Sequence, residues 1–70
     1  MTKPYIIGLE FGTWSSEVWF SGKDNPETAE KWAEAVASLK TVGDTCSNPN
    51  EFITEASEHF EKYGFTRIQR

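Results

Sequence analysis

The chain has 70 residues, and its net charge of −4 comes with a single cysteine and no apolar run of membrane-spanning length. This length predicts one domain, residues 1–70, close to the lower limit at which a hydrophobic core folds without a disulfide or metal. The lone Cys46 excludes an internal disulfide and a cysteine-rich metal cage, and it is typical of a reducing environment. Without a signal peptide or membrane span, we expect a cytoplasmic protein with no membrane partner.

The negative charge is concentrated in the middle of the sequence. Residues 24–61 contain nine carboxylates and two lysines, a net charge of −7, whereas the rest of the chain carries +3. The Lys and Arg clusters that attract phosphates are absent, so we expect no direct binding to nucleic acid. This uneven distribution of charge produces an electric field that steers and selects charged partners. We therefore expect a protein partner to be basic.

Two alternating segments, 5–11 and 14–20, predict a β-hairpin around Gly12-Thr13. Gly at the first central position suits a type II′ turn of two residues, and this turn fixes the register. The pairs on one face are Phe11–Trp14, Leu9–Ser16, Ile7–Val18 and Tyr5–Phe20. On the opposite face Ile6 faces Trp19, and Glu10 faces Ser15.

Two helices follow, each with the same start signal. Asn25-Pro26 predicts a helix over 26–42 that ends at Gly43, after a loop from Gly22. Its predicted buried stripe is Ala29, Trp32, Val36 and Leu39, with Ala33 and Ala35 on the flanks. Asn48-Pro49 predicts a second helix over 49–62 that Gly64 closes. The predicted stripe of this helix is Phe52, Ile53, Ala56, Phe60 and Tyr63.

The remaining segment, 65–69, is too short for a helix and predicts a brief third strand. The expected fold class is therefore α+β: a β-hairpin, two antiparallel helices and a short third strand (ββααβ). These elements form two layers, with the helices on one face of the sheet. The sequence leaves open whether the third strand pairs with the first or the second.

No residue pattern indicates catalysis, a metal site or a cofactor. Cys46 and His59 are about 15 Å apart along the predicted elements, too far for a nucleophilic pair. Glu10 and Glu17 are diagonal neighbours on the open face of the hairpin, about 7–8 Å apart, a spacing that an inverting glycosidase pair tolerates. A wet, flat sheet face offers neither a desolvated acid nor a sugar-binding cleft. We therefore expect no enzyme, no catalytic residue, no metal and no cofactor.

The exposed faces of the two helices are acidic. The residues that we predict for binding a partner there are Glu27, Glu30, Glu34, Glu51, Glu55 and Glu58. One interpretation is a solvated face that keeps a small protein soluble. The other is an anionic surface matched to a basic partner, for example by imitating the phosphate spacing of a duplex.

The uncovered face of the sheet is the second candidate surface. Ile6, Glu17 and Trp19 lie on it, and Gly8 leaves room for close approach. Trp is prominent in binding hot spots, so this face is predicted to bind a partner or to form a homodimer, unless a terminal segment or the last strand covers it. A very small domain gains stability by dimerising.

The sequence thus favours a small, acidic, non-enzymatic protein that binds another macromolecule. In size and acidity it is similar to small phage-encoded inhibitors of host defence, which include anti-CRISPR proteins and DNA mimics. The similarity is one of size and acidity, and no sequence motif carries it. It implies a viral inhibitor that blocks a basic or nucleic-acid-binding protein. The alternative is a structural or assembly protein that homodimerises through the open sheet face.

Overall fold

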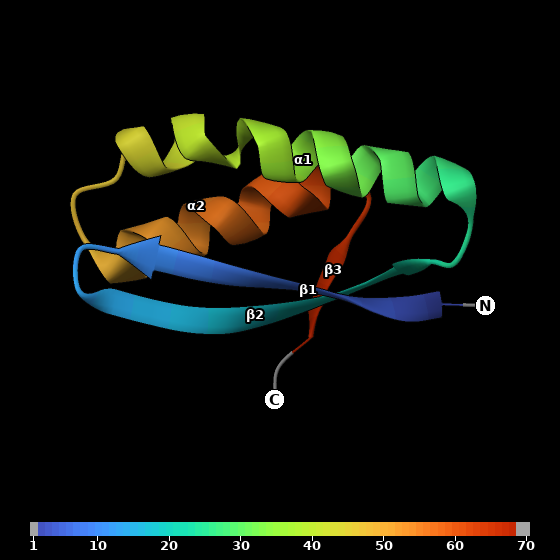
Figure 1. The fold of residues 1–70 in the computed structure, drawn as a ribbon, viewed down its shortest axis with the longest axis horizontal. Helices are drawn as coiled ribbons and strands as arrows, with labels where there is room; N and C mark the ends of the chain where they lie inside the picture. Colours follow the sequence, from blue (N-terminus) through green and yellow to red (C-terminus); the bar gives the residue numbers. More distant parts are fainter. Residues whose placement is uncertain (1, 69–70) are drawn as a thin grey trace.

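The computed structural model describes residues 2–68. Two long strands, β1 (Thr2–Phe11) and β2 (Trp14–Lys23), precede two helices, α1 (Pro26–Asp44) and α2 (Pro49–Lys62), and a short strand, β3 (Thr66–Ile68). The antiparallel sheet has the order β1-β2-β3, and both helices lie on one side of it (Figure 1). The predicted α+β class and ββααβ order are confirmed. Gln69, predicted as the end of β3, lies outside the described residues.

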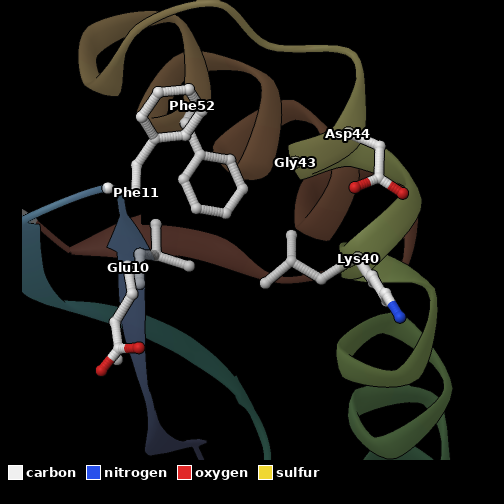
Figure 2. Close-up of a pocket in the computed structure, with 10 residues that line it drawn as sticks. Glu10, Phe11, Lys40, Gly43, Asp44 and Phe52 are labelled. Carbon is white, nitrogen blue, oxygen red and sulfur yellow. The ribbon is translucent and has the colours of Figure 1, made fainter.

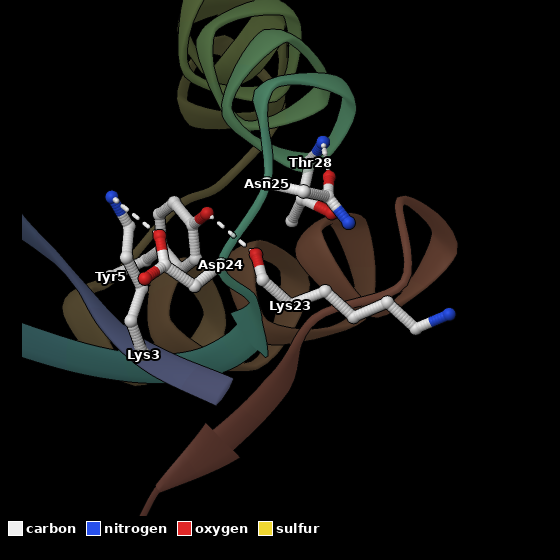
Figure 3. Close-up of polar contacts among 6 residues, drawn as sticks. All are labelled: Lys3, Tyr5, Lys23, Asp24, Asn25 and Thr28. Atoms are coloured by element: carbon white, nitrogen blue, oxygen red, sulfur yellow. Dashed lines mark hydrogen bonds and ion pairs between the residues drawn. The ribbon is translucent and has the colours of Figure 1, made fainter. Parts of the chain in front are cut away.

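The hairpin has the predicted register, from Phe11–Trp14 to Tyr5–Phe20. Gly12 has a φ of 61° and the φ of Thr13 is not positive, as a type II′ turn requires. Both strands are longer than predicted, because pairing continues to Thr2–Lys23. Gly22 and Lys23, predicted as loop residues, therefore belong to β2. The Tyr5 hydroxyl donates to the carbonyl of Lys23 (2.9 Å) and holds this end of the hairpin together (Figure 3).

Each helix begins at an Asn-Pro pair, as predicted. The Asn25 side chain accepts a hydrogen bond from the backbone N–H of Thr28 (2.8 Å), which is drawn in Figure 3. Asn48 accepts an equivalent bond from Glu51 (2.8 Å). These bonds satisfy N–H groups that have no partner in the first turn of a helix.

The two helices end differently. At the end of α2 the N–H of Phe65 bonds to the carbonyl of Phe60, and that of Gly64 (φ 95°) bonds to Glu61, which is a Schellman motif. The predicted role of Gly64 is confirmed. The predicted end of α1 at Gly43 is wrong, because α1 continues to Asp44 and is capped by Thr45. Thr45 takes the place of glycine by donating both its N–H and its hydroxyl to the carbonyl of Val42.

An aromatic cluster fills the core at the open end of the hairpin. It consists of Tyr5, Phe20, Trp32, Phe60 and Phe65, whose ring centroids lie 4.6–5.8 Å apart in the contacting pairs. At the turn end the core is thinner. There the ring of Phe11 lies 6.0 Å from that of Phe52, beside the buried Leu9 and Leu39.

The buried stripe of α1 is rotated from the predicted one. Trp32 and Leu39 pack in the core as expected, but Ala35 is fully buried while Ala29, Ala33 and Val36 are exposed. The small side chain of Ala35 lets α2 approach α1 closely on that side. The sequence did not distinguish the two phases, because Trp32 and Leu39 belong to both.

Candidate functional site

The glutamates predicted for partner binding lie on the outer side of the helical layer. Glu27, Glu30, Glu34, Glu55 and Glu58 are exposed, and Glu51 is half-buried. Ser47 donates a hydrogen bond to the Glu51 carboxylate (3.2 Å). Within residues 2–68 the ion pair found is Lys3–Asp24, which includes none of these glutamates.

One contact between the helices fixes the position of the α1 glutamates relative to those of α2. His59 Nε2 lies 2.9 Å from the carbonyl oxygen of Ala35 and 3.0 Å from Ser38 Oγ. This contact places the Ser38 face of α1 against the His59 face of α2.

The acidic residues follow those same two faces. Glu27 and Glu34 precede Ser38 by eleven and four residues, so they lie in line with it along α1, and Glu30 lies between them. Glu55 precedes His59 by one turn and forms a line with Glu51 and Glu58. Because α1 and α2 run antiparallel (Figure 1), the two stripes extend from this contact in opposite directions along the helical pair. We call these six residues the interhelical acidic surface.

The Ser38–His59 pair was not anticipated from the sequence, and it resembles part of a nucleophilic dyad. Its hydrogen bonds assign it a packing role. Nε2 faces a carbonyl oxygen, which only accepts, so Nε2 carries the proton and does not take one from Ser38. Ser38 in turn donates to the carbonyls of Glu34 and Ala35 (3.0 and 3.2 Å). The pair joins two helices and leaves no free base beside the hydroxyl.

Cys46 and the hairpin carboxylates lie on other elements than the helical glutamates. Cys46 is half-buried, with its Sγ donating to the carbonyl of Val42 (3.2 Å). Burial raises the pKa of this thiol, and the charges of Glu51 and Glu55 raise it further. Glu10 and Glu17 are exposed on the sheet, opposite Ser15 and Gly8.

The open face of the sheet carries a row of three apolar residues. Ile6 pairs with Trp19, and Trp19 pairs with Ile68 on its other side, so the row crosses all three strands. The sequence analysis did not include Ile68, because the place of β3 was open. Ile6 is 45% exposed, whereas Trp19 and Ile68 are half-buried. The indole N–H of Trp19 donates to the carboxylate of Glu17 (3.2 Å), so the three predicted residues of this face lie together.

A groove of about 350 Å³ lies at the turn end of the molecule, between β1 and the end of α1. Figure 2 shows Glu10 and Phe11 on one side of it, Lys40, Gly43 and Asp44 on the other, and Phe52 beside Phe11. No sequence pattern predicted this groove, because it depends on where the end of α1 lies relative to β1.

No three His, Cys, Asp or Glu side chains in residues 2–68 are grouped so that they could hold a metal ion. Over the same residues, neither helix has the length and apolar character needed to cross a membrane.

Comparison of the chain with protein-family models, with curated proteins and with solved structures gave no significant match.

Proposed function

We propose that this protein is a non-enzymatic binding protein whose interhelical acidic surface docks on a basic macromolecular partner. The observation that supports the proposal is six glutamates on two helices that pack against each other, five of them exposed and none of them in the described ion pair. Like charges at these spacings cost a few tenths of a kcal/mol per pair in an isolated helix. A basic partner removes that repulsion on binding and is steered to the surface by the field.

In its most specific form the partner is a nucleic-acid-binding protein, and the glutamates occupy the groove that phosphates otherwise fill. The protein then acts as an inhibitor, by competition for that groove. This form rests on the acidity of the surface and on the general similarity to small phage-encoded inhibitors.

The test is capture of the partner from an extract of the source cells by wild-type protein and by two charge-reversed variants. The first variant carries Glu51→Lys, Glu55→Lys and Glu58→Lys on the acidic surface. The second carries Glu17→Lys, Asp24→Lys and Glu61→Lys, which change the net charge by the same amount elsewhere on the molecule. We expect the first variant to lose the partner and the second to retain it. Equal loss in both variants contradicts the proposal, because it means that net charge and not this surface decides binding.

The second candidate function is assembly through the open sheet face, favoured by the row Ile6–Trp19–Ile68. Apolar residues that face water on three adjacent strands are typical of an interface between two sheets. In this case the wild type sediments as a dimer and Trp19→Ala sediments as a monomer. A wild type that stays monomeric at every concentration contradicts the assembly role.

A further inference from the structure

The first observation concerns the outer edge of β1. Within residues 2–68 the strand order is β1-β2-β3, so β1 has a partner strand on one side only. Antiparallel strands alternate between residue pairs that exchange backbone hydrogen bonds and pairs that do not. Pro4 has no N–H, yet the Pro4–Ser21 pair belongs to a continuous register. This pair must therefore be one that exchanges no backbone hydrogen bonds. By alternation, the N–H and C=O groups of Ile6, Gly8 and Glu10 also point away from β2.

Pro4 blocks this edge toward the start of the strand, but the half near the turn is unprotected. A proline at an outward position removes a donor and is a common means of preventing edge pairing. No heavy atom lies within 4 Å of the position that a Gly8 side chain would take, and Gly8 and Glu10 are both exposed. The accessible edge therefore extends over Ile6, Gly8 and Glu10.

The groove described above runs beside this same half of β1. Its apolar lining is Leu9 and Phe11 from β1, Leu39 from α1 and Phe52 from α2. Leu9 and Phe11 are two residues apart and point to the helical side, so Glu10 between them points to the open side, as Figure 2 shows. A strand added to the edge alternates in the same way. Side chains opposite Leu9 and Phe11 enter the groove, and the side chain between them faces Glu10.

The charges around the groove favour a cation. Among residues 2–68, the acidic lining residues are Glu10 and Asp44, both exposed, and the basic one is Lys40. The groove also meets the last turn of α1, where the helix dipole is negative and no basic side chain compensates it. A second copy of this chain, with a net charge of −4, is disfavoured at the same edge.

We propose that the edge of β1 and the adjoining groove bind an extended segment of a partner protein by strand addition, and that this segment has the pattern apolar–basic–apolar. Main-chain hydrogen bonds to Ile6, Gly8 and Glu10 supply the affinity, and the alternate side chains supply the specificity. The two apolar side chains pack on Phe11, Leu39 and Phe52, and the basic one pairs with Glu10 across the strands. This site is separate from the interhelical acidic surface, so either proposal can fail alone.

The test is a titration of isotope-labelled protein, followed by NMR, with a blocked peptide of alternating valine and lysine. Two matched peptides serve as controls: one alternates valine and glutamate, and one has the same valines and lysines in separate blocks. We expect the alternating basic peptide to shift the amide signals of Ile6, Gly8 and Glu10 and to slow the exchange of these amides with water. We expect each control peptide to bind at least about tenfold more weakly.

Two variants test whether the peptide binds at the edge of β1. Gly8→Pro removes the outward N–H without touching the ladder with β2, and we expect it to weaken binding by at least about tenfold. Glu10→Lys is expected to weaken binding similarly, whereas Glu17→Lys, the same change on the neighbouring strand, leaves it unchanged. The Glu10 and Glu17 pair keeps the test decisive if Gly8→Pro does not fold.

Three results overturn the proposal. One is the absence of shifts at Ile6, Gly8 and Glu10 at saturating peptide. Another is that the shifts lie only along the interhelical acidic surface, which means that the peptide is held by general charge attraction. The last is slow exchange of the Gly8 amide in the free protein together with a dimer in sedimentation, which means that a second copy occupies the edge.

Discussion

Gly22 lies on β2 directly beneath the ring of Phe65. A Cβ at this position meets two ring carbons of Phe65 at 2.7 Å and one of Tyr5 at 3.1 Å. Both rings belong to the aromatic cluster, which holds them on several sides. A glycine is therefore required here by close packing and not by a turn.

Gly22→Ala is expected to lower the free energy of unfolding by about 1–3 kcal/mol, the usual cost of forcing extra atoms into a packed core. Urea unfolding measures the effect. Gly8→Ala is the matched control, since the space around Gly8 is open and its φ is not positive. A similar cost for the two variants contradicts the packing role of Gly22.

Cys46 tests the electrostatics of the loop between the helices. Burial raises the pKa of its thiol first, and the neighbouring Glu51 and Glu55 add to the effect. The raised pKa means that the thiolate forms only at higher pH than in a free cysteine. We expect the rate of alkylation by iodoacetamide to reach its midpoint above the pH at which a free cysteine reaches it.

Replacing Glu51 and Glu55 with glutamine is expected to move that midpoint to lower pH, because the charges that oppose the thiolate are gone. Glu17→Gln with Glu61→Gln is the control and is expected to leave it unchanged. A midpoint that stays in place in the Glu51 and Glu55 variant shows that these carboxylates do not act on Cys46.

At the scale of the elements, the start of each helix depends on one asparagine. We expect Asn48→Ala to lower the free energy of unfolding by about 1 kcal/mol, because the N–H of Glu51 loses its acceptor. Asn50→Ala is the matched control, two residues further along α2. In a helical position alanine is preferred to asparagine, so this change is neutral or stabilising. Equal destabilisation in thermal unfolding of the two variants contradicts the capping role.

The caps, the turn and the register were predictable because each depends on residues adjacent in sequence. Asn-Pro starts a helix and Gly12 selects a type II′ turn independently of residues distant in the sequence. The end of α1 was predicted wrongly for the opposite reason. Gly43 is a plausible stop signal, but Thr45 supplies the hydrogen bonds two residues later. The rotation of α1 about its own axis depends on the side from which α2 packs against it. No local sequence pattern predicts that side.

The place of β3 likewise depends on the whole chain. Its residues are compatible with pairing to either long strand. The Schellman motif at Gly64 reverses the chain, and Phe65 then packs on Gly22 at the end of β2. β3 therefore lies beside β2, leaves the edge of β1 free and adds Ile68 to the row on the open face. The free edge of β1 and the apolar row on the open face both follow from the position of β3 beside β2.

At the scale of the molecule, the acidic residues were predicted individually but their arrangement was not. Two glutamate stripes were evident from spacing, yet their positions relative to each other depended on the contact between His59 and Ala35. That contact, with the antiparallel course of the helices, places the two stripes on either side of it along the helical pair.

The dissociation constant of the complex with the captured partner, measured against salt concentration, tests the role of this surface most directly. We expect affinity to fall steeply as salt rises for wild-type protein, because exposed charges are screened over about 10 Å at 0.1 M salt. We expect the slope of that fall to be much smaller for the variant with lysine at Glu51, Glu55 and Glu58. A wild-type complex whose affinity does not change with salt contradicts binding through the interhelical acidic surface.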